Sequence, residues 1–158
     1  MKKIVKVFSA VMALVLCLSL FSACGGEKVT AKVIEINLTD EMYAFGVDKT
    51  QPELLKEVND FIAEIKENGK FEEICNKYFG DGEPTAVTSA EFDANKDQLV
   101  VATNAAFNPF EWREGDKFYG IDIEIMKLVA DELDMELVIE DMEFDSVVMS
   151  VGKNGIDV

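Results

Sequence analysis

The stretch of sequence that decides the fold reads LVVAT at residues 99–103, IDIEIMKLVADEL at 121–133 and ELVIE at 136–140. The first and last pieces are short and almost continuously apolar, which is typical of strands buried in a parallel sheet. In the middle piece, apolar residues recur at helical spacing, and Asp122 is expected to be the N-cap of that helix. A strand, a helix and a strand in this order predict a right-handed crossover in an α/β fold.

The same pattern continues toward the carboxyl end of the chain. Asp145 to Val151 are expected to form a short helix, and residues 156–158 to begin a further strand. On the other side of the crossover unit, residues 81–98 contain Gly, Glu, Pro, Thr, Ser and Asn without a clear apolar period, which indicates a linker. Residues 104–119 are expected to form an aromatic-rich loop.

Two helices and two strands are expected before the linker. Alternating apolar and polar residues at 33–38 favour a strand, and residues 43–47 favour a second one. Pro52 opens a helix with one apolar face that ends near Gly69, and a shorter helix covers 71–79. Its single cysteine falls on the apolar stripe, where a small core residue is a simpler interpretation than a reactive thiol.

The first 24 residues have the pattern of an export signal. A basic start is followed by an apolar run, Val7 to Phe21, that is too short to span a bilayer. The ending Phe21-Ser22-Ala23-Cys24 resembles a lipobox, in which Cys24 is acylated and residues 1–23 are removed. Residues 24–32 would then be a lipidated tether on the outer face of the cytoplasmic membrane. The alternative is an ordinary secretory signal in which the cysteine is incidental.

Charge and residue inventory exclude several functions. The formal net charge is −16, and the predicted removal of residues 1–23 would make it more negative because it removes three lysines. Such a surface repels phosphate backbones, so we expect no nucleic-acid partner. The sequence has no histidine, which excludes histidine zinc sites and Ser-His-Asp triads. We therefore expect no metal, no cofactor and no catalytic residues.

Aromatic residues follow both predicted sheet strands. Ligands of open α/β sheets collect at the carboxyl ends of the strands. Asn104 to Trp112 follow the first strand, and Phe144 follows the second. Two rings at such a place can hold the apolar part of a small ligand. The alternative for each ring, and the favoured one for Phe110, is a place in the core.

Two blocks of the sequence resemble bacterial extracellular solute-binding proteins of family 3, the periplasmic amino-acid receptors of ABC importers. VVATNAAFNPFEW, YGIDIEIMKLVADEL and DMEFDSVVMSVGKNGIDV resemble the opening of that family. YAFGVDKTQPELLKEVNDFIAEIKENGKFEEICNKYFG resembles its closing segment, yet it comes first here. The family has two lobes, and both segments belong to lobe one. The resemblance therefore implies a single, permuted lobe of the type II periplasmic-binding-protein fold, with a mostly parallel sheet and flanking helices.

The permuted order divides the mature chain into three parts. Residues 33–80 would be the carboxy-terminal part of lobe one and residues 99–158 its truncated amino-terminal part. Residues 81–98 would join them.

The resemblance also implies ligand-binding residues. Asn104 occupies the position of an acidic or polar residue that helps to hold the ligand's ammonium, and Phe107 and Phe144 occupy positions of aromatic clamps. Trp112 is a further candidate in the same aromatic segment. The threonine and arginine that grip the α-carboxylate, and the carboxylate of lobe two, have no counterpart here. Arg113 could substitute, although a solvated loop residue is the simpler interpretation. We therefore expect weak or no binding by this chain alone.

Three functions remain open at this point. The first is a lipid-anchored receptor module that takes an amino acid or similar small polar solute to an ABC importer permease. The second is an enzyme, because cyclohexadienyl dehydratases share the fold, although a chain without histidine and with one arginine supplies their chemistry poorly. The third is the remnant of a tandem receptor gene that lost its middle. Which amino acid would bind is not encoded in these patterns.

Overall fold

The computed structural model describes residues 32, 36 and 41–158. The chain divides into two compact units, residues 1–42 and Tyr43–Val158, and the fold below is that of the second unit. The predicted signal peptide and Cys24 lie outside the described residues, as do most of the predicted tether and of the strand at 33–38. Within the described part of the chain, none of the helices is long and apolar enough to cross a membrane.

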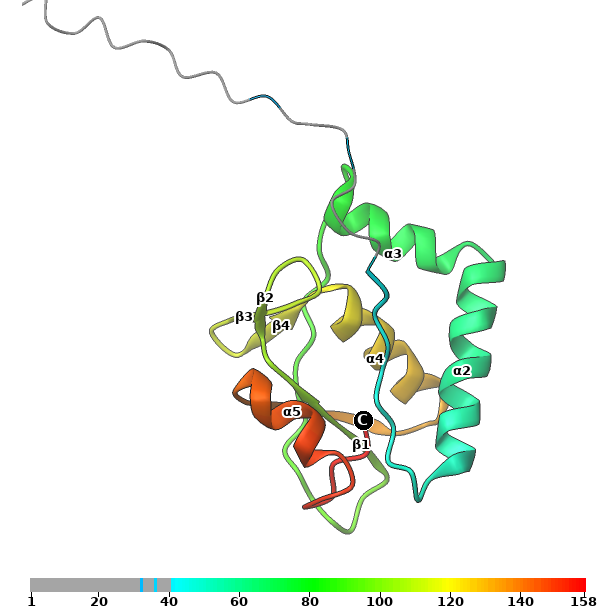
Figure 1. The fold of residues 1–158 in the computed structure, drawn as a ribbon, viewed down its shortest axis with the longest axis vertical. Coiled ribbons are helices and arrows are strands. Elements are labelled where there is room, and N and C mark those ends of the chain that lie inside the picture. The colour runs from blue at the N-terminus through cyan, green and yellow to red at the C-terminus, as the bar shows by residue number, and fades with distance from the viewer. Residues whose placement is uncertain (1–31, 33–35, 37–40) are drawn as a thin grey trace, which may run out of the picture. The chain divides into compact units, whose positions relative to one another are not determined.

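The second unit is a mixed α/β structure (Figure 1). Its main sheet has two assigned strands, β1 and β5, which pair in parallel from Gln98↔Glu136 to Thr103↔Asp141. Helix α4 lies in the connection between them. The predicted crossover unit is therefore confirmed. In chain order the elements are α2 (Pro52–Glu67), α3 (Lys70–Phe79), β1 (Gln98–Thr103), β2 (Ala106–Phe107), β3 (Glu111–Glu114), β4 (Lys117–Tyr119), α4 (Ile121–Glu132), β5 (Glu136–Asp141) and α5 (Phe144–Ser150).

Residues 104–119, predicted as a loop, contain a small antiparallel sheet of order β2-β3-β4. We call Ala106–Tyr119 the aromatic hairpin. The linker segment fastens to it, because Val87 and Phe118 exchange both backbone hydrogen bonds, at 2.8 and 2.9 Å. Further along, Ala90 N donates to Leu137 O at 2.8 Å. The linker therefore runs along the main sheet as well as connecting two segments.

The structure assigns no strand to residues 156–158, where the last strand was predicted, but these residues make strand-like backbone hydrogen bonds to β1. Asp157 N donates to Val100 O at 2.9 Å, and Ala102 N donates to Val158 O at 2.8 Å. Residues 156–158 thus continue the sheet on the side of β1 away from β5. The prediction of a strand at residues 43–47 was wrong. No strand is assigned to residues 43–47, and the backbone bond toward residues 156–158 is made by the residue just after them, from Asp48 N to Asp157 O at 2.9 Å.

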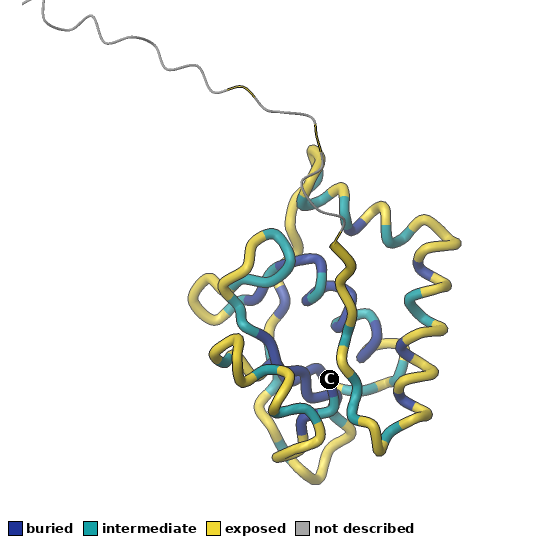
Figure 2. Tube along the Cα trace, in the orientation of Figure 1, coloured by how far each residue is buried: buried dark blue, intermediate teal, exposed yellow. Residues whose placement is uncertain are grey.

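Side chains alternate between the two faces of β1 and enter two different cores. Leu99 and Val101 join a large cluster with residues of α2, α3, α4 and β5. Val100 and Ala102 join a small cluster with Val138 and Ile156. Figure 2 shows the buried positions concentrated along β1 and α4. Since Leu54, Val58, Ile65 and Ile74 belong to the large cluster, the helices before the linker and the sheet after it share one core.

A buried polar contact also joins these two parts of the chain. Glu124, on α4, is 6% exposed. Its Oε1 accepts hydrogen bonds from Tyr78 Oη at 2.5 Å and from Thr85 N at 3.1 Å, and its Oε2 accepts one from Lys77 Nζ at 2.5 Å. A buried carboxylate is costly unless it is paired and hydrogen-bonded, and this one is both. We call these four residues the Glu124 network.

The N-cap of helix α4 lies two residues before the predicted cap, Asp122. It is Gly120, with φ of 129°, and Asp122 lies within the first turn. A side chain at Gly120 would meet Phe110 O at 2.0 Å, so the close approach of the aromatic hairpin requires glycine here. Carbonyls of the hairpin replace a side-chain cap, because Asp122 N donates to Phe110 O at 3.0 Å.

Candidate functional site

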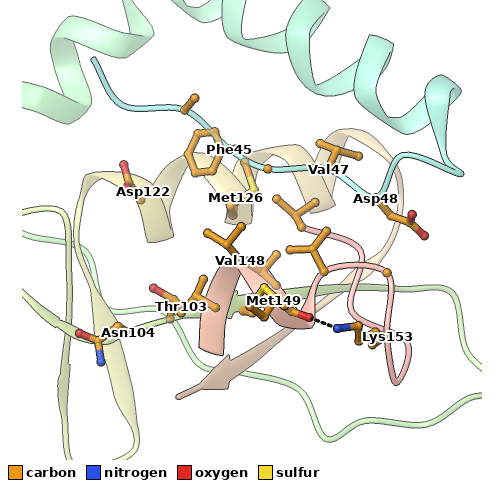
Figure 3. Close-up of a pocket in the computed structure, with 18 of the residues that line it drawn as sticks. Phe45, Val47, Asp48, Thr103, Asn104, Asp122, Met126, Val148, Met149 and Lys153 are labelled. Atoms are coloured by element: carbon orange, nitrogen blue, oxygen red, sulfur yellow. Dashed lines mark hydrogen bonds between the residues drawn. The ribbon is translucent and has the colours of Figure 1, made fainter. Parts of the chain in front are cut away.

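A pocket of about 640 Å³ lies at the carboxyl end of β1 (Figure 3). Its volume is in the range of small-molecule sites. One wall comes from the extended segment 44–50, including Phe45 and Val47, and the other comes from the end of β1 and from α5. The pocket therefore combines residues from both sides of the linker. Most of its lining is apolar.

Two of the predicted site residues line this pocket, Asn104 and Phe144. Asn104 Nδ2 donates to Met142 O at 2.9 Å, which fixes the amide and leaves its oxygen as an acceptor. Phe144 is the first residue of α5 and is 74% exposed, so its ring stands at the open rim. An amide oxygen and a ring face can hold a small molecule that carries both a polar and an apolar group.

The other two predicted residues, Phe107 and Trp112, do not line the pocket. Phe107 stacks on Phe110 at 5.4 Å between ring centroids, and Phe110 stacks on Tyr43 at 4.4 Å. Trp112 stacks on Tyr119, also at 5.4 Å. Phe110, expected in the core, is half-buried against the large cluster. A ligand contact by Phe107 or Trp112 stays a prediction.

The structure adds pocket residues that were not predicted. Phe45 and Val47 come from the extended segment before α2, and Val148 and Met149 come from α5. The signal that could have identified α5 is its composition: it has apolar side chains on more than one face, yet the structure buries none of its residues. Val148 is 81% exposed.

Two carboxyl groups meet in the pocket wall. Glu111, the first residue of β3, and Asp122, in the first turn of α4, both line the pocket, and their side chains are in hydrogen-bonding contact. Burial, together with the charge and the hydrogen bond of Asp122, raises the pKa of Glu111 to about 7. Burial also raises the pKa of Asp122, to about 6, against a lowering by the hydrogen bond with Glu111. No pattern in the sequence indicates this pair.

Arg113 does not reach the pocket. Its Nε donates to Gly115 O at 2.7 Å, one Nη lies 3.9 Å from Asp141 Oδ2, and its guanidinium lies over the Phe118 ring. Its side chain is 48% exposed, as expected for a solvated residue, although it lies on β3 rather than in a loop. Among the residues placed by the structure, no group of acids and cysteines is arranged to hold a metal ion.

Residues 3–81 and 99–158 match the family model of bacterial extracellular solute-binding proteins, family 3. The chain belongs to this family. The unmatched residues 82–98 nearly coincide with the predicted linker, and the mixed fold with a parallel sheet and flanking helices agrees with a lobe of the type II binding-protein fold.

Curated relatives point in the same direction. Over 65 residues the chain is 32% identical to "Arginine-binding extracellular protein ArtP" of Bacillus subtilis (strain 168), which covers 41% of this chain and 26% of the relative. Over 67 residues it is 28% identical to "Probable ABC transporter arginine-binding protein ArtJ" of Chlamydia trachomatis serovar D, with the same coverage of both proteins. The chain thus spans about a quarter of the length of these relatives. No solved structure gives a significant match.

Proposed function

We propose that this chain is an exported, lipid-anchored binding module of an amino-acid ABC importer and carries part of a ligand cleft. The observation that carries the proposal is the pocket, because it lies at the carboxyl end of a parallel strand and its walls come from both family-matched blocks. The family and both curated relatives are binding proteins by name.

The two blocks are proposed to be the closing and opening segments of one lobe in swapped order. Support comes from the shared core, in which Val58 and Ile74 pack with Leu99 and Val129. The Glu124 network adds a polar contact across the same junction. Swapping two segments of a lobe leaves the packing intact if the new connection is long enough, and residues 81–98 supply that connection.

A basic amino acid such as arginine is the ligand class that the relatives suggest. Asn104 would accept a hydrogen bond from the ammonium group, and Phe144 would pack on the side chain. The cleft has no arginine to grip the α-carboxylate, since Arg113 lies elsewhere. An arginine grips a carboxylate with two parallel hydrogen bonds. Each hydrogen bond to a charged group contributes about 1.5–3 kcal/mol, so the absence of both weakens binding by about two to four decades.

Amide NMR titration tests this function. The protein lacking residues 1–23 is titrated with arginine to millimolar concentration, with proline as the comparison ligand. We expect fast-exchange shifts at Thr103, Asn104 and Phe144, with dissociation in the millimolar range. Phe144→Ala should reduce the shifts, whereas Phe92→Ala is the matched control, because Phe92 is also an exposed phenylalanine, at 53% against 74% for Phe144, and does not line the pocket.

Two outcomes decide against parts of this proposal. If no amino acid shifts the pocket amides at millimolar concentration, the pocket is not a ligand cleft. If isothermal titration gives low-micromolar affinity, the cleft in this chain is complete, and the proposal that it has no group to bind the α-carboxylate is wrong.

The proposed anchor is Cys24, and the permease is the proposed partner that receives the ligand. Acylation at this cysteine would hold an acidic protein at a membrane without any basic patch. Expressed in a bacterial host, the wild-type protein should be found in the membrane fraction, and Cys24→Ser should be found outside it. If the wild-type protein and Cys24→Ser are found in the membrane fraction to the same extent, the proposed lipid anchor is wrong.

A further inference from the structure

The contact between Glu111 and Asp122 lies where the aromatic hairpin meets α4. Hairpin carbonyls cap the helix at this point, because Asp122 N donates to Phe110 O at 3.0 Å, and this bond places Asp122 beside Glu111, the next residue of the hairpin. Glu111 Oε2 is buried and receives no hydrogen bond from any donor in the described residues. A buried oxygen of this kind calls for a proton or a donor, because an unpaired buried polar atom is costly.

The surrounding cations are engaged elsewhere. Lys77, on α3, pairs with Glu124, and Arg113, on β3, lies beside Asp141 and Gly115 O. Lys117, on β4, donates to Thr88 Oγ1 at 2.6 Å, and Lys153, beyond α5, donates to Met149 O at 2.7 Å. Burial and the partner carboxyl are the causes that shift the pKa of Glu111 and Asp122, and no lysine or arginine is among them.

The remaining charged groups on the elements around the pair are mostly acidic. They include Glu114 on β3, Glu124, Asp131 and Glu132 on α4, Glu136, Glu140 and Asp141 on β5, Asp145 on α5, Asp157 near the carboxyl end and Asp48 in the extended segment. The cations among them are Lys127 on α4, which pairs with Asp131, and Lys49 in the extended segment. Lys49 lines the same pocket but does not contribute to either pKa shift. The junction therefore has no cation to replace a proton.

We propose that Glu111 and Asp122 share one proton across the junction of β3 and α4, and that this proton fastens the aromatic hairpin to the helix. While it is present, one carboxyl donates to the other. Once it leaves, two like charges face each other in a partly buried site. This device does not depend on the proposed ligand function, although both residues line the same pocket.

The direction of the pH effect follows from proton binding. Glu111 has an ordinary pKa of 4.5 in the unfolded chain and about 7 in the folded one, so the folded state binds more protons between these values. Stability from this group is present below pH 4.5 and is lost as the pH rises through 7. One extra bound proton lowers the folding equilibrium constant by up to about tenfold per pH unit in this window.

Two measurements test the shared proton. Carboxyl-carbon NMR of the wild-type protein should show Glu111 titrating near neutral pH. Urea unfolding from pH 5 to pH 8 should show a steep loss of stability that is clearly smaller in Glu111→Gln. Glu140→Gln is the matched control, since it removes the same charge from an exposed position on β5 and reports the general effect of the net negative charge.

The proposal is overturned if Glu111 titrates at its ordinary value, or if Glu111→Gln and Glu140→Gln show the same pH dependence as each other. If Glu111→Gln does not fold, Asp122→Asn takes its place in the unfolding series. The NMR titration uses only the wild-type protein and decides the matter independently.

Discussion

The two faces of the main sheet are covered very differently. On one face, α2, α3 and α4 pack over Leu99 and Val101, and α4 alone has seven buried residues. On the other face, α5 lies near Val100 and Ala102 but none of its residues is buried. The side chains of β1 are thus buried on both faces, in a large core under three helices on one side and in a small core on the other, where the residues of α5 themselves stay unburied.

This difference separates stability from binding. Apolar burial is the main source of folding free energy, and it is concentrated on the face with three helices. The open face keeps side chains such as Phe144 and Val148 in contact with solvent, at the rim of the pocket. Regions with few buried contacts are also those that open most easily. Mutations on the face with three helices should therefore mainly lower the free energy of unfolding, and mutations on the α5 face should mainly affect ligand binding.

The largest expected effect is on the closed face. Ile74, on α3, is fully buried in the large cluster. Ile74→Ala should lower the free energy of unfolding by about 2–5 kcal/mol, because it removes buried methyl groups and leaves a cavity. Urea unfolding at constant pH measures the change.

Val148→Ala on α5 is the matched control for the open face. Because Val148 is 81% exposed, this variant should stay within about 0.5 kcal/mol of the wild type. Similar losses in the two variants would mean that α5 is buried in solution, and the contrast between the faces would not hold.

A smaller effect is expected in the Glu124 network. Tyr78→Phe removes the hydroxyl that donates to Glu124 Oε1 and accepts from Gly120 N at 3.2 Å. Leaving buried polar groups without a partner should cost about 1–3 kcal/mol in unfolding free energy. Differential scanning calorimetry of Tyr78→Phe beside Tyr119→Phe, which keeps the network, isolates the hydroxyl's contribution. No difference between these variants would show that Glu124 is held by Lys77 and Thr85 alone.

The crossover unit could be predicted from sequence because its signals are local and strong. Residues 99–102 and 137–139 are short continuous apolar runs, and the helix between them has a clear period. The aromatic hairpin could not be predicted, because its strands are only two to four residues long, which is too short to show an alternation of apolar and polar residues. The segment 43–47 has the composition of a strand, yet no ladder is assigned to it, because composition alone does not provide a pairing partner.

The candidate site was predictable only in part, for a related reason. Asn104 and Phe144 follow strand ends, and that position alone indicates a ligand edge. Phe45 and Val47 reach the pocket through a tertiary contact between distant segments, which no local pattern reveals. The Glu111–Asp122 pair depends on how a glycine lets the hairpin approach α4. In the sequence the two acids are simply two of many.

The Glu124 network has a consequence for how the chain folds while it is being synthesised. Lys77 leaves the ribosome well before its partner Glu124, which lies 47 positions later, and strand β5 emerges later still. Helices α2 and α3 therefore have no finished surface to cover until most of the chain exists. Contacts between such distant segments form slowly, because a long loop must close first. Under the proposed export, this delay would keep the chain unfolded while it is threaded through a membrane.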